Sequence, residues 1–112
     1  MSDCLFCKII EKKIPAAFEL EEKDLVAIRD INPQAPVHVL VIPREHVDKI
    51  EDLTVAQTIL TGKLVEAARR LAKQFKLSGY RLVFNNGSEA GQSVFHIHLH
   101  LLGGRVMSWP PG

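Results

Sequence analysis

The chain has 112 residues, which is enough for one compact domain with a hydrophobic core and too few for two ordinary domains. Its 14 Lys and Arg residues nearly balance its 13 Asp and Glu residues, which excludes bulk electrostatic binding to nucleic acid or to an anionic membrane. The apolar runs are too short to span a bilayer, and residues 1–4 lack the basic-then-apolar pattern of a secretion signal. We therefore expect one domain over residues 1–112, located in the cytoplasm.

The first half of the chain predicts a short helix followed by three strands. Residues 4–11 favour the helix, which must end before the following proline because proline restricts the preceding residue. Phe18–Glu21 and Leu25–Arg29 flank a polar turn, and their lengths suit an antiparallel hairpin. After a proline-rich loop, residues 37–42 are rich in β-branched side chains and predict a mostly buried strand, with His38 as a polar exception.

The second half predicts one long helix and two further strands. Apolar residues recur every three or four positions over residues 54–76, after a Thr-x-x-Gln capping box, which indicates an amphipathic helix. Residues 80–85 predict a strand, and a glycine-rich loop at residues 86–93 leads into the last strand, residues 94–102. Five strands with short connections and one long helix favour an antiparallel α+β sheet over a doubly wound fold.

His96, His98 and His100 alternate with apolar residues in the last predicted strand. Successive side chains of a strand point to opposite faces, so the three histidines share one face, with neighbours about 7 Å apart. Imidazole can act as a nucleophile, a general acid or a cationic donor near neutral pH. The pattern predicts a face that acts on a phosphate group; a solvated polar face and a catalytic zinc site are the alternatives.

The loop before this strand and one acidic residue fit a nucleotide. Gly87 and Gly91 permit backbone angles that can aim N–H groups at an anion. Three side chains of the same region are neutral hydrogen-bond donors: Asn85, Gln92 and Ser93. Asp30 falls at a strand end, where its carboxylate can accept two ribose hydroxyls. Each feature alone is also compatible with an ordinary turn, so their value lies in their combination with the histidines.

Residues 96–102 have the form His-φ-His-φ-His-φ-φ, where φ is apolar, and this run resembles the signature of the histidine triad superfamily. The resemblance extends along nearly the whole chain, through residues 6–10, 14–16, 30–38, 41–43 and 91–95. Residues 103–105 and 109–112 are similar to the Hint branch of that superfamily. The resemblance implies a homodimer in which two five-stranded α+β subunits join their sheets.

The resemblance also implies an activity. Members of the branch hydrolyse purine nucleoside 5′-phosphoramidates, such as adenosine 5′-monophosphoramidate, to AMP or GMP and an amine, without a catalytic metal. By matching position, His98 would attack the α-phosphorus to form a nucleotidyl-histidine, and His100 would hold the non-bridging oxygens. Ser93 would help the leaving group, and His38 would support the orientation of His98. A dinucleoside polyphosphate hydrolase and a non-catalytic nucleotide-binding adaptor are the alternatives.

The same resemblance assigns the remaining nucleotide contacts. Asp30 and the backbone of Ile31 would bind the ribose, and Trp109 would reach towards the partner subunit's site. The phosphate cradle would consist of Asn85, Gly91, Gln92 and Ser93. An apolar base pocket would consist of Leu5, Phe6, Ile9 and Ile28. Ile28 stands where relatives often carry an aromatic ring.

Cys4 and Cys7 form a C-x-x-C motif, which in a reducing cytosol suggests a metal or redox role more than a structural disulfide. With His46 and His96 they match the ligand positions of histidine triad proteins that carry structural zinc, in a closed Cys₂His₂ tetrahedron. The alternative is two free thiols on a short helix. If zinc binds, His96 is a ligand, which supports His98 as the nucleophile.

Overall fold

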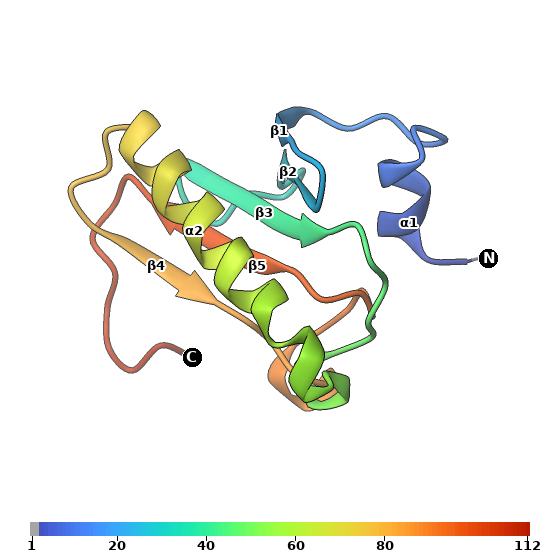
Figure 1. Cartoon of the computed structure of the whole chain (residues 1–112). Coiled ribbons are helices and arrows are strands. Elements are labelled where there is room, and N and C mark those ends of the chain that lie inside the picture. The colour runs from blue at the N-terminus through green and yellow to red at the C-terminus, as the bar shows by residue number, and fades with distance from the viewer. Residues whose placement is uncertain (1–2) are drawn as a thin grey trace.

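The computed structural model describes residues 3–112, which form a five-stranded antiparallel sheet in the order β1-β2-β3-β5-β4 with one long helix (Figure 1). The helices and strands are α1 (Leu5–Ile10), β1 (Phe18–Glu21), β2 (Leu25–Arg29), β3 (Val37–Pro43), α2 (Ile59–Gln74), β4 (Tyr80–Val83) and β5 (Leu99–Gly103). The predicted α+β fold is confirmed. Among the described residues, no helix is both long and apolar enough to cross a membrane.

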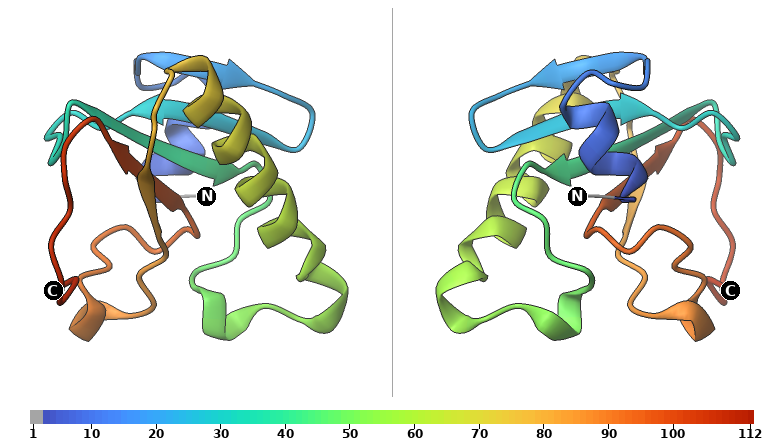
Figure 2. Two further views of the ribbon diagram at one scale, coloured as in Figure 1. Left: turned by 90° about the vertical axis from the view of Figure 1, so that its left-hand side faces the viewer. Right: turned by 90° about the vertical axis from the view of Figure 1, so that its right-hand side faces the viewer.

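The two helices cover opposite faces of the sheet, α2 one face and α1 the other (Figure 2). Odd-numbered residues of β2 and β3 pack in the α2 core, and even-numbered residues pack against α1. This division follows from the two-residue period of a strand. It also explains why β2 and β3 are apolar apart from Arg29 and His38, since both faces of these strands are largely buried.

Two predicted elements differ from the structure. The helix predicted over residues 54–76 is divided, because the capping box of Thr54 and Gln57 caps a 3₁₀ turn (Val55–Gln57) ahead of α2. The strand predicted from residue 94 begins only at Leu99. Its first residues leave the sheet because the N–H of Ile97 donates to the carbonyl oxygen of Val47, 2.8 Å away, in the loop that follows β3.

Gly104, directly after β5, provides a test of the packing at this end of the sheet. Its φ is +93°, and an added Cβ would lie 2.9 Å from Cβ of the rigid Pro36 ring. We expect Gly104→Ala to lower the free energy of unfolding by about 2–4 kcal/mol, through backbone strain and overpacking. Urea denaturation measures this. Gly79→Ala is the matched control, because a Cβ there meets no atom within 4 Å; equal losses in both variants would contradict the prediction.

Candidate active site and metal site

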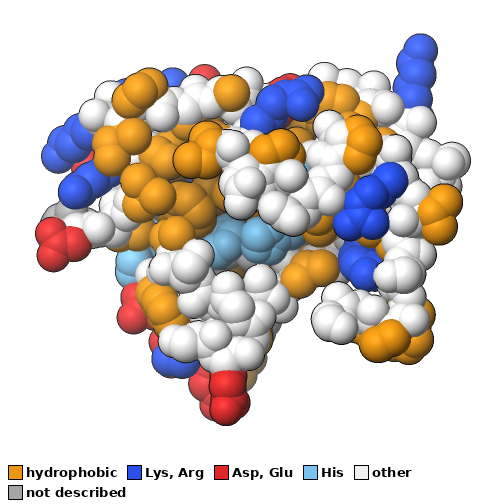
Figure 3. Space-filling view, turned by 180° about the vertical axis from the view of Figure 1, so that it is seen from behind, with side chains coloured by type: hydrophobic (Ala, Val, Ile, Leu, Met, Phe, Trp, Pro, Cys, Tyr) orange, Lys and Arg blue, Asp and Glu red, His pale blue; other side chains and the backbone are white. Residues whose placement is uncertain are grey.

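Four histidines gather on the face of the sheet that α1 covers. His38 lies on β3 and His100 on β5, whereas His96 and His98 lie in the segment just before β5. The ring centroids of His98 and His100 are 4.9 Å apart, and those of His38 and His100 are 5.2 Å apart. Histidine side chains are visible in a hollow beside a group of hydrophobic side chains (Figure 3). The alternation of the sequence therefore still directs the histidines to one face, although the regular strand begins later.

The hydrogen bond of His98 defines which of its nitrogens can react. Nδ1 of His98 lies 2.8 Å from the carbonyl oxygen of His96, and a carbonyl oxygen can only accept. Nδ1 therefore carries the proton, and Nε2 keeps a lone pair. Burial lowers the pKa of His98, which keeps the ring neutral near pH 7. A neutral imidazole with its lone pair on Nε2 is a nucleophile in its reactive form.

His38 and His100 form a second hydrogen-bonded unit. The backbone N–H of Gln34 donates to Nδ1 of His38 at 3.0 Å, so the proton of a neutral His38 lies on Nε2. That nitrogen is 2.9 Å from Nδ1 of His100, which must accept. The proton of a neutral His100 is consequently on Nε2, where it can be donated to a phosphate oxygen.

This arrangement corrects the expected role of His38. His38 was expected to support the orientation of His98, but its hydrogen bond reaches His100 instead. The strand register explains the difference, because Leu40 pairs with His100 and His38 therefore lies diagonally across from it. His98 precedes β5, and the backbone of His96 orients it.

The buried environment of His100 predicts a loss of stability in acid. Burial, followed by the nearby His98 and His38, lowers the pKa of His100 to about 4, against an ordinary value of 6.5. Between these pH values the unfolded chain binds a proton that the folded ring does not, so the free energy of unfolding falls as the pH falls. We expect His100→Gln to remove about 1–2 kcal/mol of this loss, a value reduced for the partial exposure of the ring.

Urea denaturation of both proteins at several pH values from 7 to 4, with EDTA present, measures the difference. Groups far from the site affect both proteins alike, so the difference between the two profiles reports His100 together with its neighbours His38 and His98. Parallel stability profiles would contradict the prediction.

Asp30 lies at the same end of the site. One carboxylate oxygen accepts the backbone N–H of Asn32 at 2.8 Å, and the other lies 3.5 Å from Nε2 of His38. The predicted ribose ligand is thus held by its own turn beside the histidine unit, and Ile31, which follows it, is fully exposed. A nucleotide with its phosphate at the histidines would have its ribose within reach of this carboxylate.

The side-chain amide of Gln92 makes its hydrogen bonds within the protein. Its amide was expected to bind phosphate, yet Oε1 accepts the N–H of Gly87 at 2.7 Å, and Nε2 donates to the carbonyl oxygens of Asp48 and Val94 at 2.8 and 3.1 Å. The side chain is only 4% exposed. Gln92 therefore braces the loop from within, because both of its N–H donors already have acceptors.

The glycine-rich loop also uses its backbone N–H groups internally. Gly87 and Gly91 adopt the left-handed φ values that the sequence suggested, +90° and +95°. However, the N–H groups of Ala90 and Gln92 donate to the carbonyl of Gly87, and that of Gly91 donates to Ser88. These N–H groups do not form the expected anion nest, because the loop closes a 3₁₀ turn on itself. Ser93 is exposed, and Asn85 is half-buried.

The structure brings together three of the four residues expected to contact the base. Phe6, Ile9 and Ile28 belong to the apolar cluster between α1 and the sheet. The Phe6 ring stands edge-on to His98, with centroids 5.0 Å apart. Leu5 is 43% exposed, at the start of α1. Trp109 is 81% exposed on the C-terminal tail.

The four predicted metal ligands converge although they come from three separate parts of the chain. Ligand atoms of Cys4, Cys7, His46 and His96 all lie within 4.8 Å of one another. The two Nδ1 atoms are 3.1 Å apart. Nδ1 of His96 lies 3.3 Å from Sγ of Cys4 and 3.6 Å from Sγ of Cys7, which is 3.4 Å from Nδ1 of His46. A tetrahedron with ordinary zinc bond lengths has edges of about 3.3 Å between nitrogens and about 3.6 Å between nitrogen and sulfur. The cluster has the dimensions of a zinc site.

The hydrogen bonds of the two histidines support the same assignment. Nε2 of His96 lies 2.8 Å from the carbonyl oxygen of Pro43, and Nε2 of His46 lies 2.6 Å from a carboxylate oxygen of Asp48. Both partners are acceptors, so both Nε2 atoms carry protons and both Nδ1 lone pairs face the cluster. Metal-ligating histidines are typically oriented in this way by a carbonyl or carboxylate partner.

Asp30, His38 and His100 also lie close enough to hold a metal ion. Their hydrogen bonds argue against this, because the Gln34 N–H requires an unprotonated Nδ1 on His38 and therefore a protonated Nε2. That Nε2 has no lone pair for a metal. The tautomer of His38 therefore disfavours a metal ion at Asp30, His38 and His100.

Comparison with known proteins agrees with the fold and the motif. The family profile described as HIT domain matches residues 11–107. Relatives include a 14 kDa zinc-binding protein of Zea mays (48% identical over 115 residues, 99% of this chain and 89% of that protein). Another is Adenylylsulfatase HINT1 of Arabidopsis thaliana (45% identical over 115 residues, 99% and 78%).

Solved structures extend the comparison. The HIT family hydrolase of Legionella pneumophila superposes with a TM-score of 0.96 at 52% identity, covering 98% of this chain and all of that one. A zinc-bound histidine triad family protein of Mycobacterium smegmatis superposes with a TM-score of 0.81 at 31% identity, covering 92% and 76%. With the profile match, these likenesses establish that the chain belongs to the histidine triad (HIT) family.

Proposed function

We propose that the protein is a hydrolase of purine nucleoside 5′-phosphoramidates of the adenosine 5′-monophosphoramidate type. The observation that carries this proposal is the pair of complementary tautomers at the site. His98 offers a lone pair on Nε2 because its Nδ1 proton is donated to His96. His100 offers a proton on Nε2 because its Nδ1 accepts from His38. A nucleophile beside a neutral hydrogen-bond donor suits attack on a phosphorus that carries anionic oxygens.

The reaction would proceed in two displacements at the α-phosphorus. In the first, the Nε2 lone pair of His98 forms a bond to phosphorus while the P–N bond to the amine breaks, and the departing amine takes up a proton with help from Ser93. In the second, water attacks the phosphorus, the bond to Nε2 breaks, and a proton is released with AMP or GMP. Only water is consumed overall, and the chemistry needs no catalytic metal.

A second substrate is favoured by one of the relatives. The Arabidopsis thaliana protein is named as an adenylylsulfatase, and attack by His98 on an adenylyl sulfate would differ only in the leaving group. The decisive experiment compares kcat/KM for an adenosine phosphoramidate, adenylyl sulfate and a dinucleoside polyphosphate. We expect the phosphoramidate to be preferred. Preference for the polyphosphate would support a dinucleoside polyphosphate hydrolase instead. Tight AMP binding without turnover of any substrate would support a non-catalytic adaptor.

We further propose a structural zinc ion at Cys4, Cys7, His46 and His96. The tetrahedral spacing supports this, as do the name of the Zea mays relative and the zinc-bound Mycobacterium smegmatis protein. Bound zinc would link α1 to the loop after β3 and to the segment before β5. A zinc site with two cysteine ligands suits a reducing compartment, and we propose the cytoplasm as the location.

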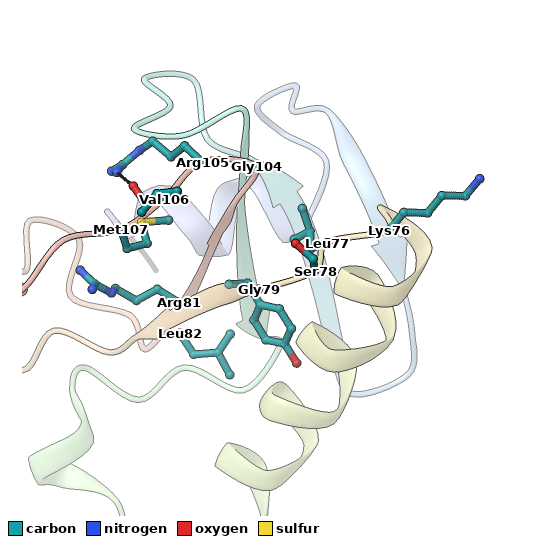
Figure 4. A pocket seen from close by; sticks show the side chains of 11 residues that line it. Lys76, Leu77, Ser78, Gly79, Arg81, Leu82, Gly104, Arg105, Val106 and Met107 are labelled. Atoms are coloured by element: carbon teal, nitrogen blue, oxygen red, sulfur yellow. Dashed lines mark hydrogen bonds between the residues drawn. The ribbon is translucent and has the colours of Figure 1, made fainter.

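A homodimer joined along β4 is the final part of the proposal. β4 and β1 are the edge strands of the described sheet, and β1 is protected by a register irregularity and by glutamates. β4 instead borders a cavity of about 820 Å³, lined by residues 76–82 and 104–107, from which Lys76 points away (Figure 4). Tyr80, Val106 and Trp109 are exposed nearby along the chain.

A second copy would cover these apolar side chains and bring Trp109 towards the partner subunit's site. Light scattering at micromolar concentration should give the mass of two chains. The mass of a single chain would contradict the dimer.

A further inference from the structure

Two hydrogen-bonded connections join the cysteine–histidine cluster to the candidate active site. We propose that the cluster and the nucleotide site are energetically coupled, so that zinc bound at Cys4, Cys7, His46 and His96 strengthens AMP binding, and AMP strengthens zinc binding by the same factor. This inference rests on the proposed nucleotide function of the histidine site. It assigns positioning roles to His96, Asp48 and Gln92 that go beyond holding a metal or binding phosphate.

The first connection runs through His96, which is fully buried. Its ring offers Nδ1 to the cluster, and its Nε2 donates to the carbonyl oxygen of Pro43 at the end of β3. Its own backbone carbonyl accepts the Nδ1 proton of His98 at 2.8 Å. The side chain of His96 is thus part of the cluster, and its backbone carbonyl accepts the hydrogen bond of the nucleophile. A cation that fixes the ring of His96 also restricts the acceptor that orients His98.

The second connection runs through Asp48 and Gln92. The Asp48 carboxylate accepts from Nε2 of His46 at 2.6 Å, and its backbone carbonyl accepts from Nε2 of Gln92 at 2.8 Å. Gln92 in turn accepts the N–H of Gly87 and donates to the carbonyl oxygen of Val94, at the two ends of the glycine-rich loop. The loop that precedes the triad is therefore fastened to the segment that supplies a cluster ligand.

A cavity and one aromatic ring also lie beside both regions. The cavity, of about 580 Å³, is lined by Cys4, His46 and Asp48 and by Ser93 and Val94, which precede the triad. Phe6, between the two cysteines in sequence, stands edge-on to both His96 and His98, with ring centroids 6.0 and 5.0 Å apart. Phe6 is therefore a common neighbour of a cluster ligand and of the proposed nucleophile.

The expected coupling follows from the ordering of these shared residues. Zinc would restrict His96 and Asp48, and AMP binding requires the nucleophile and the loop that they hold. Whichever ligand binds first orders these groups for the second, and binding affinities must then change reciprocally. We expect each ligand to tighten the other by about 5-fold to 20-fold, within the usual range of such couplings.

The test uses the reduced full-length protein and needs no turnover. Zinc affinity is measured by competition with a chromophoric chelator, with and without saturating AMP. AMP affinity is measured by calorimetry on zinc-loaded and on EDTA-treated protein. Equal factors of about 5-fold or more in both experiments are expected. Zinc affinity that AMP leaves unchanged, or that AMP weakens, would overturn the proposal, as would the absence of zinc binding.

Two variants separate positioning from general structural damage. Gln92→Met removes the amide that connects Asp48 to the loop, and should reduce the coupling factor while zinc affinity without AMP stays within about 2-fold of the parent. Gln74→Met, at the exposed end of α2, is its matched control and should keep the full factor. A full coupling factor in Gln92→Met would contradict the second connection.

If Gln92→Met does not fold, Asp48→Asn tests the other end of this connection, the carboxylate that accepts from Nε2 of His46. It should weaken zinc binding by about 10-fold, as is usual for partners that orient a ligating histidine. Asp52→Asn, whose carboxylate is bound by Lys49, is its control. Equal zinc affinities of these two variants would remove Asp48 from the connection.

Failure of this proposal is distinguishable from failure of the proposed function. Turnover of a phosphoramidate without coupling would leave the function intact and reject the coupling. Reciprocal coupling without turnover of any nucleotide would reject the hydrolase and keep the coupling.

Discussion

His98→Ala should lower kcat/KM for an adenosine phosphoramidate by at least about 10⁴-fold, because removal of a covalent nucleophile typically costs this much or more. Its Nε2 is the atom expected to form the bond to phosphorus, and its Nδ1 is already used by the carbonyl of His96. His100, Ser93 and Asp30 could still hold the nucleotide. Binding of AMP should therefore weaken much less than turnover.

A fluorogenic adenosine phosphoramidate measures the turnover, and calorimetry with AMP shows whether the site remains formed. Trapping of a nucleotidyl-protein adduct by rapid acid quench should succeed for the parent and fail for His98→Ala. The matched comparison is Ser93→Ala, which keeps the nucleophile and should lose far less turnover. Undiminished turnover of His98→Ala would reject the mechanism.

Zinc should raise the stability of the protein by about 4 kcal/mol at free zinc 1,000-fold above its Kd, because binding to the folded state alone stabilises it by mass action. For a domain of this size, the corresponding increase in Tm is about 15–20 °C. The four ligand atoms come from α1, the loop after β3 and the segment before β5. Zinc would therefore cross-link three regions that the unfolded chain keeps apart.

Thermal unfolding of the reduced protein in zinc and in EDTA measures the effect. Cys7→Ser should lose most of the zinc-dependent increase while unfolding near the parent temperature in EDTA. Magnesium is the control ion, because it binds oxygen ligands and has little affinity for thiolates. A Tm that zinc does not change, or that magnesium raises equally, would contradict the zinc site.

Much of the fold was predictable because local patterns and tertiary packing agree. The limits of β1 and β2 follow from the polar turn between them and from their lengths. β3 could be recognised as mostly buried from a run that is rich in β-branched residues and apolar except at His38. The beginning of β5 could not be predicted, because the hydrogen bond from Ile97 to Val47 draws the chain out of the sheet, and no local pattern encodes that partner.

In the candidate site, too, the residue types were predictable from the sequence, whereas their hydrogen-bond partners were not. The type and alternation of His96, His98 and His100 are visible in the sequence, and their common face persists in the structure. The partner of His38 was predicted wrongly, because diagonal neighbours depend on the register between β3 and β5. The bracing role of Gln92 was missed for a related reason, since one of its acceptors, Asp48, is 44 residues away.

The groups available for chemistry can be read from the amino-acid order alone: three alternating histidines, an acidic residue at a strand end, a glycine-rich loop and two cysteines three positions apart. Side-chain type and a two-residue period are local properties, so the sequence displays them directly. The nitrogen of each histidine that carries the proton depends on the folded chain, because folding sets which donors and acceptors face each ring. Folding likewise makes the cysteine–histidine cluster and the nucleophile meet at one residue, His96, through its side chain and its backbone.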